Sequence, residues 1–315
     1  MRKNINLSRI ASLALFAAAF IWGTSFVIMK DVSERLPPSF LLAVRFTIAC
    51  LLLSAISWKR LKRLNKSYIF PGVLIGALLF SAYLVQTYGL IGTTPGKNAF
   101  LTASYCIITP FLFWIVSKKH PDGFHLASAL VCLAGIFLIS VDFSSENLFS
   151  VALGDILTLI CGFFYAAHIV AITTTANDKD PMLITILQFG VAAVLSWLSY
   201  GVLYAFGKAP FFMEGADIGG LSLQLLYLAC ACTAAALFLQ NFGQKYAHPT
   251  GAAVILTFEA VFGALFSLLL GREDGFDVLR AVGFVLVFLA VIISETKLSF
   301  LRKRKNKTIH KGDLS

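Results

Sequence analysis

Charged residues are scarce in this sequence. Asp, Glu, Lys and Arg make up 13% of its 315 residues, whereas hydrophobic residues make up 58%, and a soluble domain carries about twice that share of charge. The hydrophobic residues come in runs of about 20, the length of a membrane-spanning helix. This composition excludes an ordinary soluble protein and predicts an all-α integral membrane protein.

Motifs for nucleotide, zinc or nucleophilic chemistry are also missing. Gly96-Lys97 resembles the end of a phosphate-binding loop, but position 91 is Ile instead of Gly, and Asn98 follows instead of Ser or Thr. The sequence contains no His/Glu zinc motif and no Gly-x-Ser-x-Gly. All six cysteines fall inside hydrophobic runs, which predicts small buried side chains rather than disulfides or metal ligands. We therefore expect no cofactor, no metal and no direct use of ATP.

Ten hydrophobic segments are long enough to cross a membrane. We expect them at residues 10–29, 40–58, 69–91, 98–116, 124–141, 154–173, 182–206, 221–242, 250–270 and 278–294. The connections are short and often contain Pro or Gly, so they leave no room for a soluble domain. The first segment is too long for a signal-peptide core and lacks a small-x-small cleavage site, which predicts a retained helix.

The basic residues predict the orientation of the chain. If the N-terminus is cytoplasmic, 19 of the 26 Lys and Arg residues lie on the cytoplasmic side, 6 lie outside, and Arg45 lies within a span. Positive charge is enriched on the cytoplasmic side of membrane proteins. We therefore expect a multi-pass protein of the cell membrane with both termini in the cytoplasm, and we interpret the net charge of +10 as an orientation signal rather than a nucleic-acid site.

One stretch of the sequence occurs twice. Residues 83–96 read YLVQTYGLIGTTPG and residues 237–251 read LFLQNFGQKYAHPTG, so Gln86 and Gln240 correspond at a displacement of 154. Residues 38–46 likewise match residues 181–189 at a displacement of 143. Each half would hold five spans, so the second half enters the membrane from the opposite side. Inverted repeats of this kind are typical of secondary transporters.

The repeat defines the expected domains. Residues 1–145 form the first repeat, residues 146–296 form the second, and residues 297–315 form a basic cytoplasmic tail. The inverted arrangement predicts that corresponding helices, including the two that carry Gln86 and Gln240, occupy equivalent places around one cavity.

Three stretches resemble a known family. They are IWGTSFVIMK with LPPSFLLAVRF, GKNAFLTASYCIITPFLFWI, and PTGAAVILTFEAVFGALFSLLLG, and they are similar to the EamA-like families of the drug/metabolite transporter superfamily. The resemblance covers nearly the whole chain and implies a ten-helix exporter or importer of small metabolites, amino acids among them. One position differs, because the family commonly has Glu-Pro where this chain has Glu259-Ala260. We therefore expect a straighter helix there.

Polar side chains inside the spans are the candidate site residues, because such groups usually face a bundle interior or a water-filled cavity. Asn98, Thr102 and Tyr105 share one face of the fourth span. The candidate substrate-binding residues are Trp22, Tyr83, Gln86, Asn98, Thr102, Tyr105, Tyr165, His168, Gln240 and Asn241. Hydrogen bonding within a helix, packing between helices and placement at the membrane interface are the alternative interpretations.

Two charged residues lie deep in the spans. Arg45 lies seven residues beyond Pro38, and Glu259 lies near the middle of the ninth span. A lone buried glutamate tends to be protonated or paired, so Glu259 is a candidate for ion coupling and both residues are candidate buried charges. Structural pairing is the alternative for each.

These features predict a secondary transporter that moves a small metabolite, such as an amino acid or a drug-like solute, by alternating access. The alternatives are an integral-membrane enzyme that uses Glu259 and His168 on a lipid-like substrate, and a channel. The expected partners are a small-molecule substrate and the lipid bilayer, with protons as one candidate coupling ion and no nucleic acid. The protein is expected to be a monomer or a homodimer.

Overall fold

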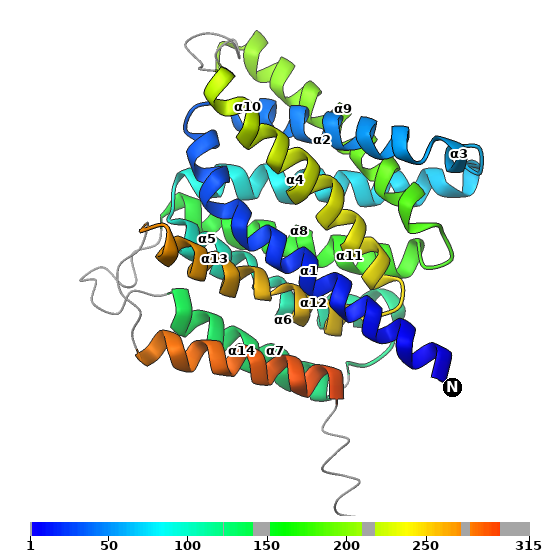
Figure 1. Cartoon of the computed structure of the whole chain (residues 1–315), viewed down its shortest axis with the longest axis vertical. Helices are drawn as coiled ribbons and strands as arrows, with labels where there is room; N and C mark the ends of the chain where they lie inside the picture. The colour runs from blue at the N-terminus through cyan, green and yellow to red at the C-terminus, as the bar shows by residue number, and fades with distance from the viewer. Residues whose placement is uncertain (1, 122, 141–151, 210–217, 272–277, 297–315) are drawn as a thin grey trace, which may run out of the picture.

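The computed structural model describes residues 2–121, 123–140, 152–209, 218–271 and 278–296, and within these ranges all regular secondary structure is helical (Figure 1). The first half of the chain contains α1 (Arg2–Ser33), α2 (Pro38–Ile56), α3 (Trp58–Leu61), the 3-10 turn η1 (Lys66–Tyr68), α4 (Ile69–Ile91), α5 (Pro95–Thr102), α6 (Tyr105–Ser117) and α7 (Gly123–Ser140). The second half contains α8 (Leu153–Thr175), α9 (Pro181–Ala205), α10 (Ile218–Tyr227), the π-helical segment η2 (Leu228–Ala235), α11 (Ala236–Gln244), α12 (Pro249–Leu256), α13 (Phe258–Leu269) and α14 (Val278–Thr296).

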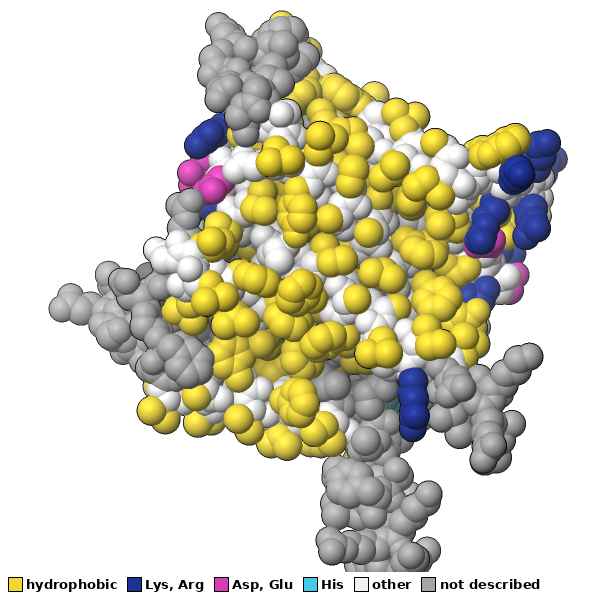
Figure 2. All heavy atoms as spheres, viewed as in Figure 1, with side chains coloured by type: hydrophobic (Ala, Val, Ile, Leu, Met, Phe, Trp, Pro, Cys, Tyr) yellow, Lys and Arg dark blue, Asp and Glu magenta, His cyan; other side chains and the backbone are white. Residues whose placement is uncertain are grey.

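The helices account for the ten predicted spans. Eight helical segments of the described chain are long and apolar enough to cross a membrane, and shorter apolar stretches lie in α7 and α14. Figure 2 shows a broad face of hydrophobic side chains, with Lys and Arg gathered beyond it, most of them at the end that carries α3. An apolar belt between charged ends is what a lipid bilayer requires of a protein that spans it.

Prolines start the corresponding helices of the two halves. Pro38 begins α2 and Pro181 begins α9, while Pro95 begins α5 and Pro249 begins α12. Proline suits the first position of a helix because its fixed φ is helical and its missing N–H has no partner there in any case. The local sequence therefore sets four helix starts in the same register in both halves.

Packing follows the inverted repeat. The Cβ of an alanine at Gly89 in α4 would lie 2.9 Å from the carbonyl oxygen of Gly154 in α8, and one at Gly243 in α11 would lie 2.9 Å from that of Ala11 in α1. Gly89 and Gly243 are 154 residues apart, and Ala11 and Gly154 are 143 apart. Equivalent residues thus make equivalent contacts. Two pairs of corresponding helices also pack together, α2 with α9 and α7 with α14 (Figure 1).

The fourth and ninth spans are each interrupted at the same place in the repeat. The break between α5 and α6 begins at Ala103, and the break between α12 and α13 lies at Thr257, 154 residues later. The Thr257 hydroxyl donates to the carbonyl oxygen of Val254 at 2.6 Å, and such bonds bend helices. The expectation of a straighter helix at Glu259 is therefore wrong, because a threonine interrupts it without a proline.

Candidate functional site

A cavity lies between the two halves. Its wall is formed by Trp22, Ser25, Phe26, Met29, Arg45, Tyr83, Gln86, Leu90, Asn98, Tyr105, Tyr165, Ile169, Gln240, Leu256 and Glu259. The volume open to the centre of a water-sized sphere is about 40 Å³, and one buried water needs roughly 10–15 Å³ of such volume. The cavity therefore has room for a few waters in this conformation, and a metabolite would need the walls to move apart.

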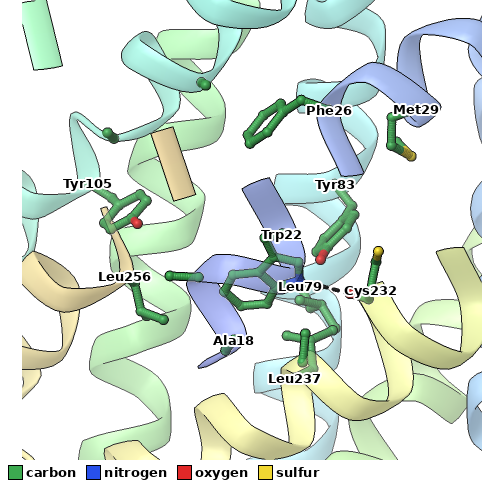
Figure 3. Close-up of a cluster of buried hydrophobic side chains, with 14 of the residues drawn as sticks. Ala18, Trp22, Phe26, Met29, Leu79, Tyr83, Tyr105, Cys232, Leu237 and Leu256 are labelled. Carbon is green, nitrogen blue, oxygen red and sulfur yellow. Dashed lines mark hydrogen bonds between the residues drawn. The ribbon is translucent and has the colours of Figure 1, made fainter. Parts of the chain in front are cut away.

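Aromatic rings form much of the wall. The rings of Tyr83 and Tyr165 meet edge to face with centroids 5.7 Å apart, and those of Tyr105 and Tyr165 meet likewise at 6.3 Å. The indole N–H of Trp22 donates to the carbonyl oxygen of Cys232 in η2 at 2.8 Å, the bond drawn in Figure 3. These contacts fix the rings, because edge-to-face pairs and a satisfied indole N–H each favour one orientation.

Gln86 is held by two hydrogen bonds. Its Nε2 donates to Thr102 Oγ1 at 3.1 Å, and its Oε1 accepts from the Tyr165 hydroxyl at 2.8 Å. Asn98, its neighbour on the wall, donates to Thr158 at 2.8 Å. The side chain of Gln86 thus links α4, α5 and α8 and orients one of the wall tyrosines.

Gln240 differs from its counterpart Gln86 in its bonding. It lines the same cavity and is buried, yet its Oε1 has no hydrogen-bond partner among the residues that the structure describes. An unpaired buried amide oxygen is costly and usually has an explanation such as a water or a ligand. The repeat therefore provides one glutamine whose side chain is hydrogen-bonded within the protein and one whose side-chain oxygen can still accept a hydrogen bond.

Tyr105 and Glu259 meet at the centre of the repeat. The Tyr105 hydroxyl donates to Glu259 Oε1 at 3.1 Å, and the two residues are 154 positions apart, the displacement that relates the halves. Tyr105 lies two residues after Ala103, where the first break begins, and Glu259 lies two residues after Thr257, where the second break lies. Equivalent residues touch where a pseudo-twofold axis passes, so this contact lies at the axis of the inverted repeat.

Arg45 is the buried cation of the cavity wall. It is 1% exposed, its Nε donates to Thr233 Oγ1 at 3.1 Å, and its Nη1 lies 2.7 Å from the thioether of Met29. The guanidinium also lies 5.2 Å from the centre of the Tyr83 ring. Among the described residues no carboxylate lies within ion-pair distance of Arg45.

Nine of the twelve candidate residues line the cavity, and three lie behind its wall. Thr102 is buried against Gln86, and His168 lies 3.1 Å from Gln188 Oε1. Asn241 donates to Thr185 at 2.8 Å and lines a smaller crevice near Lys245. Their polar groups form hydrogen bonds between helices rather than lining the cavity.

Six further wall residues are not among these twelve candidates. They are Ser25, Phe26, Met29, Leu90, Ile169 and Leu256. Most are apolar, so nothing in their chemistry distinguishes them from core or lipid-facing residues. Helical spacing is the signal that finds some of them, because Phe26 follows Trp22 by four positions and Leu90 follows Gln86 by four.

Polar contacts join the two halves of the chain at two separate places. At the end of α4, which we call the first side, Lys97 Nζ lies 2.7 Å from Asp155 Oδ2, and Thr93 donates to the same carboxylate at 2.7 Å. At the start of α9, the second side, Arg60 lies 3.5 Å from Asp180. Each contact joins a residue of the first half to one of the second.

The described residues contain no cluster of three or more His, Cys, Asp or Glu side chains that could hold a metal ion. All six cysteines are free thiols, and four of them are buried. The chemistry available at the cavity is therefore that of aromatic rings, amides, hydroxyls and the two charged groups Arg45 and Glu259.

Comparisons with known proteins agree with this architecture. The model of the EamA-like transporter family matches residues 9–141 and 152–296. An uncharacterized transporter of Archaeoglobus fulgidus is 32% identical over 283 residues, which cover 90% of this chain and 85% of the relative. A second from the same organism is 24% identical, over 90% of this chain and 97% of the relative. In Bacillus subtilis the uncharacterized transporter YwfM is 24% identical over 59% of this chain and 63% of its own length.

The fold is found in a solved structure. A crystal structure with 18% sequence identity superimposes with a TM-score of 0.73 over 92% of this chain and 98% of that one. At this identity the likeness concerns the fold alone. The architecture of most of the chain is thus shared with a protein of known structure.

Proposed function

This chain belongs to the EamA-like transporter family, and we propose that it carries a small amphipathic metabolite across the cell membrane by alternating access. It is a transporter rather than an enzyme. The observation that supports the mechanism is the cavity between two inverted halves, with Tyr105 and Glu259 in contact at equivalent positions. In such folds the substrate lies near the midplane and the halves take turns to close it off.

The wall residues divide into three roles in this proposal. The rings of Trp22, Tyr83, Tyr105 and Tyr165 cover the apolar body of the solute, as in most small-molecule sites. Gln86 positions Tyr165, to which it is already bonded. Gln240 offers its unpaired Oε1 to a donor on the solute.

Alternation would loosen the contacts on one side at a time. We assign the Lys97–Asp155 contact to the outer side and the Arg60–Asp180 contact to the cytoplasmic side, following the predicted orientation with both termini in the cytoplasm. Each contact joins the two repeats, which we place at residues 1–145 and 146–296. Opening either side therefore separates the halves at that end.

Glu259 is the candidate coupling residue. It is the carboxyl group of the cavity wall, and among the described residues it has Tyr105 but no cation as its partner. A buried carboxylate is neutralised by a proton or a bound cation. We propose that Glu259 exchanges a proton during the transport cycle.

The purified protein in sealed liposomes tests this function. Candidate solutes are first ranked by the rise in melting temperature that they cause, since a ligand of the folded state stabilises it by mass action. Uptake of the ranked solutes is then measured with radiolabel and product analysis. A saturable, counterflow-competent uptake of an unchanged solute is expected. Linear flux without counterflow would indicate a channel, and a chemically altered product would contradict transport.

A further inference from the structure

Arg45 is the buried cation of the cavity wall. It is 1% exposed, and in the part of the chain that the structure describes no carboxylate lies within ion-pair distance of it. The other charge of the cavity wall, Glu259, is bonded to Tyr105 instead. The two opposite charges of the cavity are thus not paired with each other, although both groups line it.

The contacts of Arg45 are poor substitutes for an anion. A guanidinium has five N–H donors, and two of them are used, one on the Thr233 hydroxyl and one on the Met29 thioether, a weak acceptor. The Tyr83 ring adds a cation–π contact at 5.2 Å. A buried charge normally has a charged partner because its lost hydration is otherwise uncompensated. Donors are therefore left over at the cavity.

The π-helical segment holds this guanidinium in place. The Thr233 hydroxyl donates to the carbonyl oxygen of Leu228, five residues earlier, at 2.7 Å. Its oxygen is consequently oriented to accept from Arg45 Nε. Single π-helical turns are rare and occur frequently at functional sites. The arrangement fixes the orientation of the planar guanidinium before any ligand arrives.

We propose that the transported solute carries a carboxylate, and that this carboxylate pairs with Arg45 while the body of the solute lies among the cavity's aromatic rings. The inference rests on the proposed transport function and adds the class of substrate. The planar fork of a guanidinium matches a carboxylate with two parallel hydrogen bonds. Arg45 is the one cationic side chain among the described residues that line the cavity, so one negative charge is neutralised there. A phosphate ester carries about −1.5 to −2 at neutral pH and leaves a charge unpaired.

Matched acids and amides test the pairing. The probes are benzoate with benzamide and 3-phenylpropanoate with 3-phenylpropanamide, which differ in charge but hardly in shape. Binding to the detergent-purified wild type is followed by melting temperature and ligand-observed NMR at millimolar concentration. We expect each acid to bind roughly ten-fold more tightly than its amide, the effect of one charge-assisted hydrogen-bonded contact.

Variants of Arg45 test whether this residue causes the preference for acids over amides. Arg45→Gln should bind acid and amide alike, Arg45→Lys should keep part of the preference, and Lys208→Gln, which removes an exposed cation away from the cavity, should bind as wild type does. Equal binding of acids and amides by the wild type overturns the inference, whatever the folding of the variants. A preference for acids over amides that survives in Arg45→Gln also overturns the inference. A wild type that binds neither acid overturns it as well.

Transport measurements distinguish a failure of this inference from a failure of the proposed transport function. If liposomes take up a neutral or cationic solute and Arg45→Gln takes it up equally well, the protein is a transporter and the inference is wrong. If acids bind in an Arg45-dependent way but no solute is translocated, the anion site stands and the proposed function fails. Uptake of a carboxylate that is lost in Arg45→Gln and partly restored in Arg45→Lys supports both.

Discussion

At the residue scale, the inverted repeat brings unlike side chains to equivalent places. Tyr105 and Glu259 occupy the same register in the two halves and bond to each other, so one half supplies the donor and the other the acid. Gln86 and Gln240 are identical in type but differ in bonding. The cavity is therefore symmetric in position and asymmetric in chemistry, which gives a solute one preferred orientation.

The role of Glu259 predicts a change in pH dependence. Tyrosine and arginine side chains do not ordinarily change charge near neutral pH, which leaves Glu259 as the group on the described wall that is expected to exchange a proton. Transport by Glu259→Gln should vary little with pH, whereas wild-type transport should vary. Rates in liposomes across pH 5–8 measure this, with Tyr105→Phe as the variant that keeps the carboxyl group. An unchanged profile with full activity removes Glu259 from the mechanism.

The two glutamines predict opposite outcomes for the same substitution. Gln86→Leu leaves Thr102 and the Tyr165 hydroxyl without their partner, so it should lower the free energy of unfolding by about 1–3 kcal/mol. Gln240→Leu removes an amide oxygen that has no partner, so stability should be kept. If Gln240 binds the solute, affinity should fall instead by about 1–3 kcal/mol.

Thermal unfolding and solute-binding measurements on both variants test these two predictions. A destabilised Gln240→Leu, together with a stable Gln86→Leu, reverses the assignment of roles. Two stable variants with wild-type affinity indicate that both glutamines serve only packing.

At the element scale, helix packing predicts the cost of adding one methyl group. Gly89→Ala and Gly243→Ala each place a Cβ 2.9 Å from a carbonyl oxygen of the facing helix. Both should lower the free energy of unfolding, by about 1–3 kcal/mol for an overpacked contact. Gly201→Ala, where a Cβ meets nothing within 4 Å, is the control. It should be neutral or stabilising by up to about 1 kcal/mol, since alanine is the better helix former.

The melting temperatures of the three glycine variants, measured in one detergent, test this prediction. If Gly201→Ala is as destabilised as the other two, the effect comes from α-helical glycine in general and not from close approach. If only one of Gly89→Ala and Gly243→Ala is destabilised, the two halves are packed less alike than their equivalent contacts indicate.

The sequence predicted those elements that local chemistry determines. Hydrophobic run length predicted the spans to within a few residues. Two spans were predicted to begin at residues 98 and 250, whereas the helices begin at Pro95 and Pro249, which correspond in the repeat. Polar residues at the cavity, such as Gln86, were found because a polar group in lipid is costly. His168 was misplaced because another buried side chain, Gln188, satisfies it. Phe26 was missed because an apolar cavity wall has no distinct composition.

Two irregular elements could not be predicted from periodicity. The break at Thr257 and the π-helical segment around Thr233 depend on hydroxyls that bond back to carbonyls three and five residues earlier. Ser and Thr form such bonds in regular helices too, so the residue type alone does not reveal them. Both irregularities adjoin the charges of the cavity, Glu259 and Arg45.

At the scale of the whole molecule, transport requires that contacts hold each side of the protein closed and yet be weak enough to break when that side opens. Lys97 and Asp155 are 2.7 Å apart, with 35% and 4% of their side chains exposed, whereas Arg60 and Asp180 are 3.5 Å apart and 53% and 23% exposed. Exposed ion pairs contribute about 0–1 kcal/mol. The contact on the first side is therefore the stronger of the two.

This difference predicts opposite shifts in accessibility. Asp155→Asn should favour opening of the first side and Asp180→Asn opening of the second, the former by more, because its ion pair is shorter and less exposed. Asp180 is the N-cap of α9, where asparagine serves as well as aspartate. Asp155 lies in the first turn of α8, and the amide oxygen of an asparagine there can still accept from the Ala152 N–H, so both helices should persist. A loss of about 1 kcal/mol changes the ratio of two conformations roughly five-fold.

Thiol labelling in a cysteine-free background measures the two populations. Leu90→Cys reports the first side, because Leu90 lines the cavity in the last turn of α4. Asn177→Cys reports the second side, because Asn177 lines the smaller crevice near the start of α9. Asp178→Asn is the control, since among the described residues its exposed carboxylate bonds to neighbouring Lys179 alone. Labelling of Leu90→Cys should rise with Asp155→Asn, and labelling of Asn177→Cys with Asp180→Asn. If both substitutions raise labelling on both sides, the contacts merely tighten the fold and do not alternate, because a gate that opens one side must leave the other closed.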